Sequence, residues 1–334
     1  MLMLLVMACT VKVDGQTAEE YYKKGKEKLA SNHYKDAIKY FDSSILINSK
    51  FDSAYFRRGT AKDQLGFYKA AILDYDTAII LNNSADYFYQ NRGVSKHKLK
   101  DSKGAMADLC NAIRINPKNT FAYFNRGGIK DELGDFIGAI GDYSKVIKID
   151  PSYTDAYSNR GITKGKLKDY NGALIDFNKV IKLDSKNEDG YYNRGFTKES
   201  LHDYKGAIED YNKAILLKPN YTKAILNRGS DYARVKNFTA SLNDYNKLIK
   251  LNPKDSQAFF GRGSVNLELK NYKEAIIDYT KAIELNPKDG LSYFSRGEAE
   301  YEIDKKQQAY SDFIKARDLG EHNANLLLKR YFNK

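Results

Sequence analysis

Apolar and polar positions along the chain follow a helical period that is itself repeated every 34 residues. Counted from Ala18, small or apolar residues occupy positions 4, 8 and 14 of each 34-residue segment, and again positions 20, 21, 24, 27 and 28. Spacings of mostly three or four residues place the members of each half on one face of an α-helix. Each segment therefore predicts two amphipathic helices joined by a turn.

The segment occurs nine times without insertion or deletion, over residues 18–323. Position 20 is alanine in eight copies, position 24 is Tyr or Phe in eight, and position 32 is proline in five. We expect position 1, as in Asp52 and Asp86, to provide the N-cap of the first helix, and the prolines to end the second. Position 8 is always glycine, and we expect the two helices to cross closely there and at position 20: Gly25, Gly59, Gly93, Gly127, Gly161, Gly195, Gly229, Gly263 and Gly297.

An aromatic residue at position 4, glycine at 8, alanine at 20, an aromatic at 24, alanine at 27 and proline at 32 resemble the tetratricopeptide repeat (TPR). The resemblance covers residues 18 to about 320 and implies nine tandem repeats in an all-α fold. That fold is a right-handed superhelical solenoid of helix-turn-helix hairpins with a concave groove and a convex back. Position 17 departs from the family pattern at Ser102 and Lys306. Residues 324–334 are expected to form a helix that caps the C-terminal edge.

Residues 1–17 precede the repeats and predict a signal peptide or a lipoprotein signal. Residues 1–11 carry no charged side chain, and Leu2–Ala8 is an apolar run too short to span a bilayer. The segment that ends at Cys9 resembles a bacterial lipobox, which makes Cys9 the lipidation candidate; cleavage near residues 13–15 is the alternative. We expect an exported protein, either periplasmic or anchored in the cell envelope. A cytoplasmic protein is the alternative, because the positively charged start of a signal is missing.

Positions that packing does not use are the candidates for binding. Positions 2, 5, 6, 9, 12 and 13 share one face of the first helix, and in the TPR family this face lines the groove. Position 6 is asparagine in five consecutive copies: Asn91, Asn125, Asn159, Asn193 and Asn227. A column of amides can pair with the backbone of an extended peptide, and it resembles the asparagine ladder in the TPR domain of O-GlcNAc transferase. Aromatic residues at position 5 are expected to add contacts: Tyr22, Phe56, Phe124, Tyr192 and Phe260. The alternative is that the amides bond to a neighbouring repeat and the rings pack within their own.

A pattern of charges recurs in the last eight copies. Position 7 is arginine from Arg58 to Arg296, and position 23 is aspartate from Asp74 to Asp312. Lysines from Lys62 to Lys198 occupy position 11, one turn after the arginine. A charge at a helix contact needs a partner, so we predict structural ion pairs; an anion-binding site is the alternative.

The net charge of +12 comes from 55 Lys and Arg against 43 Asp and Glu. Lysines such as Lys145, Lys179 and Lys213 collect at position 26 of the second helix, where a convex back could rest on an anionic membrane or glycan surface. A solvated face is the alternative. Acidic residues on the first-helix face argue against nucleic acid. Two cysteines and four scattered histidines argue against a metal site, and no catalytic or cofactor motif occurs.

The sequence therefore predicts a protein-interaction scaffold that binds a protein or an extended peptide segment in the groove. It predicts no enzyme activity, no cofactor and no metal. Two alternatives stay open: binding of an anionic surface or a glycan through the basic back, with peripheral membrane association, and self-assembly as a structural homo-oligomer.

Overall fold

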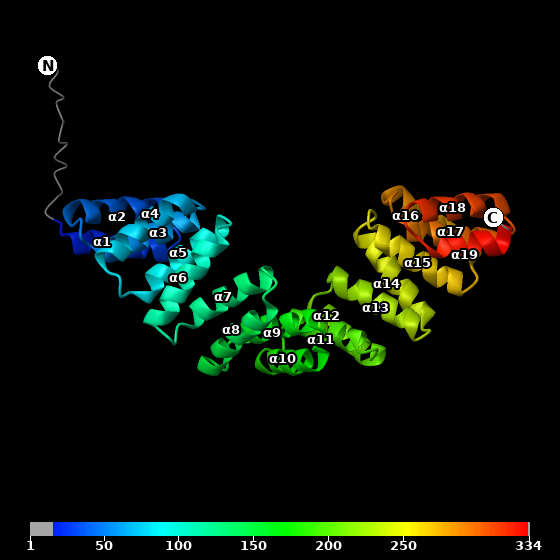
Figure 1. Cartoon of the computed structure of the whole chain (residues 1–334), viewed down its shortest axis with the longest axis horizontal. Coiled ribbons are helices and arrows are strands. Elements are labelled where there is room, and N and C mark those ends of the chain that lie inside the picture. The colour runs from blue at the N-terminus through cyan, green and yellow to red at the C-terminus, as the bar shows by residue number, and fades with distance from the viewer. Residues whose placement is uncertain (1–15, 333–334) are drawn as a thin grey trace, which may run out of the picture. The chain divides into compact units, whose positions relative to one another are not determined.

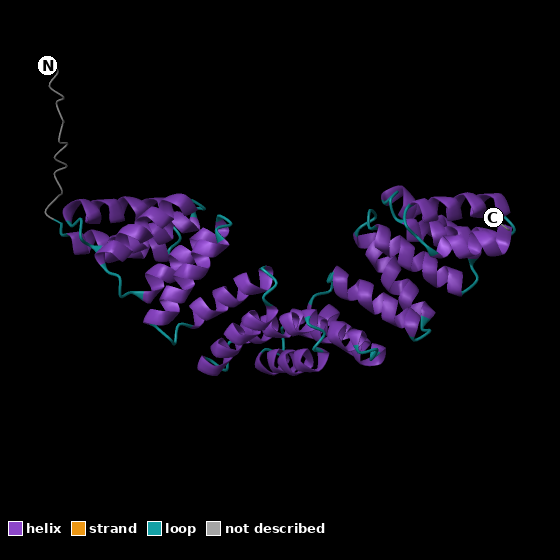
Figure 2. Ribbon diagram, in the orientation of Figure 1, coloured by secondary structure: helices purple, strands orange, loops and turns teal. Residues whose placement is uncertain are grey.

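The computed structural model describes residues 16–332, which form nineteen α-helices and no strand (Figures 1 and 2). The first eighteen helices form nine consecutive hairpins, one for each predicted repeat. The first helices of the hairpins are α1 (Ala18–Ala30), α3 (Asp52–Gln64), α5 (Asp86–Lys98), α7 (Thr120–Glu132), α9 (Thr154–Lys166), α11 (Glu188–Ser200), α13 (Thr222–Arg234), α15 (Ser256–Glu268) and α17 (Gly290–Glu302). The second helices are α2 (Tyr34–Ile47), α4 (Tyr68–Leu81), α6 (Ser102–Ile115), α8 (Phe136–Ile149), α10 (Tyr170–Leu183), α12 (Tyr204–Leu217), α14 (Phe238–Leu251), α16 (Tyr272–Leu285) and α18 (Lys306–Asp318), and α19 (Asn323–Phe332) follows them.

Part of the N-terminal prediction cannot be placed on this fold. Cys9 and the rest of residues 1–15 lie outside the described residues, as do residues 333–334 at the other end. Thr17 is described, and it begins α1 with a capping box in which its hydroxyl accepts the N–H of Glu20 while the Glu20 carboxylate accepts the N–H of Thr17. No helix among residues 16–332 is both long and apolar enough to cross a membrane.

The expected N-caps of the first helices are wrong by one residue. Asp52 and Asp86 are already the first residues of α3 and α5, and the residue before them occupies the cap. In α7 and α11 that residue is Asn119 or Asn187, whose Oδ1 accepts a backbone N–H of the first turn. The second helices use position 16 in the same way, through a set of aspartates that the sequence analysis overlooked: Asp101, Asp135, Asp169 and Asp203.

The close crossing at position 8 is confirmed. The glycine lies against the side chain at position 24 of the same hairpin, and a Cβ at Gly25 would lie 2.5 Å from Cε1 of Phe41. In the third repeat the residue at position 24 is Leu109, and a Cβ at Gly93 would be 3.3 Å from its Cγ and 3.2 Å from the carbonyl oxygen of Ala105 at position 20. Glycine is therefore needed because a ring, and not only a small side chain, occupies the crossing.

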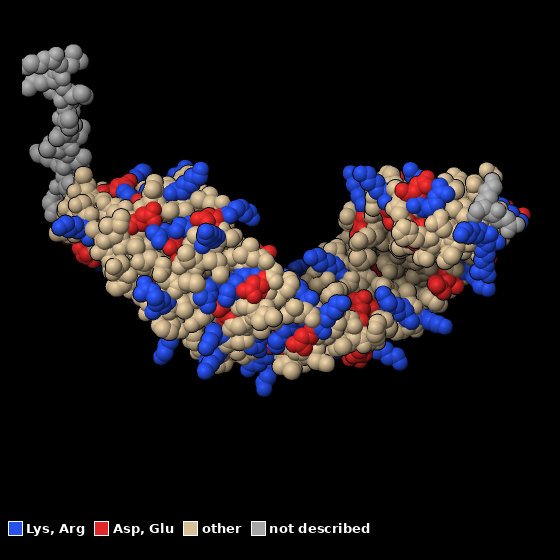
Figure 3. All heavy atoms as spheres, viewed as in Figure 1, with Lys and Arg blue, Asp and Glu red and all other residues tan. Residues whose placement is uncertain are grey.

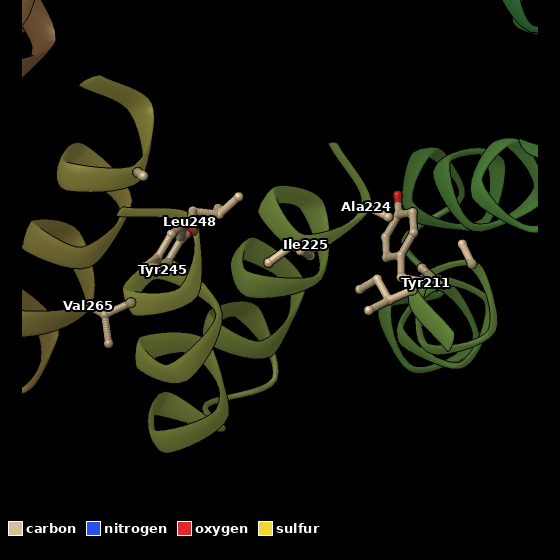
Figure 4. Packing of buried hydrophobic residues seen from close by; sticks show 10 residues of the cluster. Tyr211, Ala224, Ile225, Tyr245, Leu248 and Val265 are labelled. Carbon is tan, nitrogen blue, oxygen red and sulfur yellow. The ribbon is translucent and has the colours of Figure 1, made fainter. Parts of the chain in front are cut away.

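The chain divides into two compact units, whose described parts are residues 16–163 and 164–332. In the second unit Tyr211, Ile225, Tyr245 and Val265 come from α12, α13, α14 and α15 and belong to one buried cluster (Figure 4). Since each cluster spans neighbouring helices, a hairpin completes its core only with the next hairpin, as expected for a repeat protein. In the first unit the corresponding clusters form around Phe41, around Tyr75 and around Leu109.

Two kinds of contact link successive repeats inside each unit. Second helices pack on the first helix of the next hairpin, as in α2 with α3 and α12 with α13. First helices also contact the first helices of their neighbours, for example α3 with α5 and α13 with α15, whereas no comparable contact joins second helices among the described residues. The first helices are thus the more closely spaced set, and they form the inner side of each unit.

The C-terminal helix α19 packs on the last hairpin. Ala324 and Leu328 are buried in one cluster with Phe313 of α18. The ring of Tyr331 stacks on Tyr301 of α17 with centroids 3.9 Å apart. These contacts cover apolar surface that the other hairpins bury against a following repeat.

Candidate functional site

The arginines at position 7 are part of the framework, as the ion-pair prediction proposed. Arg126 donates through Nε and Nη2 to the two carboxylate oxygens of Asp142, at 2.9 and 2.7 Å. The Asp142 side chain is only 5% exposed, and Lys130 Nζ lies 2.9 Å from its Oδ2. Hydrogen bonds to Asp142 raise the pKa of Arg126 above its ordinary value. A buried carboxylate thus has two cationic partners within one hairpin.

The same pairing recurs in six other repeats, with the arginine bidentate to an aspartate 16 residues later: Arg58–Asp74, Arg92–Asp108, Arg194–Asp210, Arg228–Asp244, Arg262–Asp278 and Arg296–Asp312. The remaining nitrogen of the arginine, Nη1, reaches back to position 25 of the preceding repeat. The acceptors there include Asp42, Cys110, Ser144 and Asn178. Position 25 escaped the sequence analysis because its residue type changes from repeat to repeat. Each arginine joins two repeats and is not free to bind an anion.

The second cation is missing in the last three repeats, where position 11 is Tyr232, Asn266 or Glu300 instead of lysine. Glu300 is 7% exposed and lies near Asp312. Burial, together with the charge of Asp312, raises its pKa to about 7. The aspartates of these repeats therefore depend on the arginine far more than those of the second to sixth repeats.

The asparagine column lies on the first-helix face, meaning positions 2, 5, 6, 9, 12 and 13, and all five amides are partly exposed. Asn91 and Asn125 donate to the backbone carbonyls of their own helices, at Tyr87 and Phe121. Asn227 donates to the hydroxyl of Tyr211 in the preceding repeat at 3.3 Å, and Asn159 bonds to Tyr143 in the same way. The alternative, in which the amides bond to a neighbouring repeat, therefore holds for one hydrogen bond of Asn159 and one of Asn227. Each amide has two N–H groups and a carbonyl oxygen, so donors and acceptors remain after these bonds.

The aromatic residues at position 5 pack mainly within the repeats. Their rings lie against the ring at position 24 of the same hairpin, with centroids 5.6–6.0 Å apart in the pairs of Tyr22, Phe124, Tyr192 and Phe260. These four side chains stay partly exposed, but Phe56 is only 6% exposed. Phe56 can offer little area to a partner, because Tyr75, Tyr87 and Phe88 surround it.

Large apolar side chains on the same face remain exposed, and the sequence analysis did not select them. At position 9, Ile162 is 40% and Phe196 51% exposed. At position 2, Tyr87 is 42% and Phe121 58% exposed. The signal was available in the sequence, since positions 2 and 9 were already assigned to this face, but the residue type at these positions is not repeated.

Each unit has a pocket on the first-helix face. In the first unit, a pocket of about 200 Å³ lies between the third and fourth repeats, where Leu109 replaces the usual ring at position 24 and Gly128 occupies position 9. His97 and Asn125 line it, and His97 Nε2 lies 3.4 Å from a carboxylate oxygen of Glu132. In the second unit, a pocket of about 640 Å³ lies across the seventh and eighth repeats. Both pockets are on the face that carries the asparagine column.

One buried carboxyl group in the second unit lacks the partners that its neighbours have. At position 10, Ser95 and Thr163 donate to aspartates at position 12 of the preceding repeat, at 2.6 and 2.8 Å. In the seventh repeat position 10 is Asp231, and its carboxyl group lies near another acid, Glu199. Asp231 is fully buried, and neither of its carboxylate oxygens accepts a hydrogen bond within the described chain. Burial, and then the charge of Glu199, raise the pKa of Asp231 to about 7, although Arg234 Nε lies 3.8 Å from its Oδ1 and opposes the shift.

Some lysines of the second helices have partners within the protein itself. On the face drawn in Figure 3, Lys and Arg side chains alternate with Asp and Glu and with uncharged residues. Lys281 pairs with Glu284 at 2.8 Å, and Lys247 donates to the carbonyl of Pro219. Among residues 16–332, no three His, Cys, Asp or Glu side chains gather in a way that could hold a metal ion.

Comparison with known proteins identifies the family. Three family models described as tetratricopeptide repeat match residues 87–119, 122–153 and 154–187, residues 188–221, and residues 226–290, which together are more than half of the chain. A comparison with curated proteins gives no match.

Several solved structures share the fold at low identity. The C-terminal part of a TPR repeat-containing protein from Cytophaga hutchinsonii aligns with a TM-score of 0.62 at 19% identity, over 72% of this chain and 98% of that one. A tetratricopeptide repeat protein from Parabacteroides merdae aligns with a TM-score of 0.58 at 22% identity, over 74% and 98%. PilF of Pseudomonas aeruginosa aligns with a TM-score of 0.54 at 16% identity, over 62% and 94%. With its nine helical hairpins and these matches, the chain belongs to the tetratricopeptide repeat family.

Proposed function

We propose that this protein is a non-enzymatic scaffold that binds an extended peptide segment of a partner protein along its first-helix face. Tetratricopeptide repeats serve generally in protein interaction, and the comparisons support that role for the chain as a whole. The observation that carries the proposal is that two kinds of group lie on the same face. The amides of the asparagine column keep hydrogen-bond donors and acceptors without a partner in the described chain, and large apolar side chains such as Phe121 and Phe196 are exposed beside them. The second helices also carry asparagines in three consecutive repeats, Asn178, Asn212 and Asn246, near exposed apolar side chains such as Ile175, but the Oδ1 of each already accepts an arginine Nη1 of the next repeat.

The two kinds of group have complementary tasks. At about 0.5–1.5 kcal/mol for each hydrogen bond, five amides contribute roughly 5 kcal/mol before the cost of ordering the peptide. That corresponds to millimolar affinity or weaker. Covering a half-exposed ring such as Phe196 adds on the order of 1–2 kcal/mol, so several such contacts are needed for micromolar binding. The amides make the face tolerant of sequence, and the apolar side chains supply most of the affinity.

The test is to select binders from a library of random 12-residue peptides displayed on phage, using the full chain, and to measure the synthesised peptides by fluorescence anisotropy. The informative variant is Asn193→Ala, because this amide is not bonded to another repeat in the described structure. Asn243→Ala, an exposed amide on the second helix α14, is the matched control.

We expect this variant to bind about 3–10-fold more weakly, which is the loss of one hydrogen bond of about 1 kcal/mol. The control should bind as the wild type does. Equal affinity of all three proteins would place the binding surface elsewhere, and the asparagine column would then be structural only.

A further inference from the structure

The pocket of the second unit lies where the repeat pattern changes at two positions of the first-helix face. Position 6 is asparagine up to Asn227 and becomes Gly261 in the eighth repeat. Position 9 carries the large Phe196 in the sixth repeat but only Ser230 and Ser264 in the next two. Side chains that would fill the face are therefore missing in two adjacent repeats, and a pocket of about 640 Å³ opens there. Pockets that enclose small ligands have volumes of roughly 300–1,000 Å³.

The walls of this pocket are mainly apolar, with a few hydroxyl groups. Phe238, Phe260, Leu226 and Leu267 line it together with the rings of two buried tyrosines, Tyr245 and Tyr279. A Cβ at Gly261 would overlap the ring of Tyr245, so glycine lets this ring lean into space that an asparagine side chain would need. The hydroxyl of Ser264 donates to the carbonyl of Phe260 at 2.9 Å and lies 3.3 Å from the Tyr279 hydroxyl. The polar groups are thus largely satisfied, and the space favours an apolar occupant.

Charges flank the pocket asymmetrically. Toward the ninth repeat, Glu268 at the pocket rim and Glu298 and Glu302 on α17 occupy positions 9 and 13 of the same face. None of the three forms an ion pair with a cation in the described chain. Burial and the neighbouring Glu302 raise the pKa of Glu298, as expected for carboxylates that lack a cation. Toward the seventh repeat, the rim carries the exposed cations Arg234 and Lys236.

We propose that this pocket is the specificity site of the peptide-binding face. It takes one large apolar side chain, aromatic or leucine-like, of a peptide that has a Lys or Arg a few residues away. The apolar side chain enters between Phe238 and Phe260, and the basic side chain contacts the carboxylates of Glu298 and Glu302. Charge complementarity selects this occupant, because an acidic residue in the same place would lie against three unpaired carboxylates. The inference rests on the proposed function, and it adds the chemistry that the asparagine column alone cannot provide.

The experiment fills the pocket with a side chain that the protein itself carries at the equivalent position. Ser264→Phe places there the residue found at Phe196, and Thr60→Phe makes the same change at position 9 of the second repeat, outside the pocket. The probes are the 12-residue peptides selected by the full-length protein, each also synthesised with its large apolar residue replaced by alanine and with its basic residue replaced by glutamine. Glu298→Gln with Glu302→Gln, which keeps size and shape, tests the charges even if the phenylalanine variant folds poorly.

We expect the selected peptides to share a large apolar residue with Lys or Arg within about four positions, since an extended chain advances roughly 3.3 Å per residue. Ser264→Phe should weaken binding at least tenfold and Thr60→Phe less than twofold. The double glutamine variant should weaken binding about three- to tenfold at low salt and should abolish the difference between the basic peptide and its glutamine version.

Two results would overturn the inference. Peptides that lose affinity for the Asn193→Ala protein but bind Ser264→Phe and the glutamine variant normally would leave the proposed function standing and remove the pocket from it. Peptides that bind every variant equally, or a library that yields no binder, would remove both.

Discussion

The ion pairs of the framework allow a sharp test, because two repeats of the second unit differ in a single partner of the buried aspartate. Arg194 and Arg262 make the same bidentate contact, to Asp210 and Asp278, and both donate through Nη1 to an asparagine of the preceding repeat at 2.7 Å. The side chains of the two aspartates are 3% and 4% exposed. We compare Arg194→Leu with Arg262→Leu.

The magnitudes follow from what remains beside each aspartate. After Arg194→Leu, Lys198 Nζ still lies 2.8 Å from Asp210, so the cost is that of hydrogen bonds to a charged group, about 2 kcal/mol. After Arg262→Leu, Asp278 keeps only the Asn266 amide at 3.3 Å. A buried charge without a counter-charge costs about 3–5 kcal/mol. We therefore expect the second change to be about 2 kcal/mol more destabilising.

Native-state hydrogen exchange with mass spectrometry is the suitable measurement, because repeat arrays open locally and a single unfolding midpoint is not informative. The protection of α16 should fall in Arg262→Leu about 30-fold more than the protection of α12 falls in Arg194→Leu. Arg194 and Arg262 also differ in their place along the array, and adding Asn266→Lys to the Arg262→Leu variant controls for this difference. It recreates the lysine of the earlier repeats and should restore much of the lost protection of α16. Equal losses in the two single variants, or no rescue by the lysine, would refute the explanation.

Three further predictions follow from particular contacts. Gly25→Ala should lower the free energy of unfolding of the first unit's repeats, measured with urea, by about 1–3 kcal/mol, and Gly93→Ala should lower it by less than about 1 kcal/mol. The reason is that only a Cβ at Gly25 would meet a ring, at 2.5 Å. Equal losses would contradict this account. The pKa of Asp231 is raised to about 7 in the folded protein, against about 3.9 in an unfolded chain. Between about pH 4 and pH 7 the folded state therefore binds one more proton at Asp231 than the unfolded state does. Stability should consequently fall as the pH rises from about 4 to 7. Asp231→Asn should reduce that slope and stabilise the protein at pH 8 by on the order of 1–3 kcal/mol. Glu300, whose pKa is also raised to about 7, provides the remaining slope, and a slope unchanged by Asp231→Asn would contradict this assignment. Deleting residues 322–334 should expose the apolar end of the last hairpin, so we expect the truncated protein to self-associate. Its mass measured by light scattering should then rise with protein concentration. A truncated protein that stays monomeric would argue against a capping role for α19.

The fold could be predicted from the sequence because the residues that build it recur every 34 positions. Gly25 and its counterparts, the ring at position 24 and the charges at positions 7 and 23 each appeared often enough for the pattern to stand out, and the structure places them in contact. The N-caps were predicted one residue too late, at Asp52 instead of the residue before it, because position 34 varies between Phe51, Ala85 and Asn119. A cap whose residue type changes along the repeats produces only a weak periodic signal.

The candidate site was harder to predict for the same reason. The asparagines recur and were recognised, but Phe196 and Gly261 are each particular to one repeat, and serine occupies position 9 only at Ser230 and Ser264. Exposure also depends on neighbours in space: Phe56 is buried under rings from the next hairpin, while Phe260 at the same position of another repeat lines a pocket. A single sequence cannot show which member of a column is covered and which is open.

These observations point to a division of labour between repeated and unrepeated positions. The arginine and the glycine of each hairpin find their partners inside the hairpin or in the preceding one, so the ion pairs and the helix crossing do not depend on the side chains at positions 9 and 13. Those positions can therefore change with little cost to the fold, and the departure from the pattern at Ser264 is where binding specificity can arise. It follows that substitutions there should change affinity far more than stability. Substitutions in the ion-pair network should do the reverse.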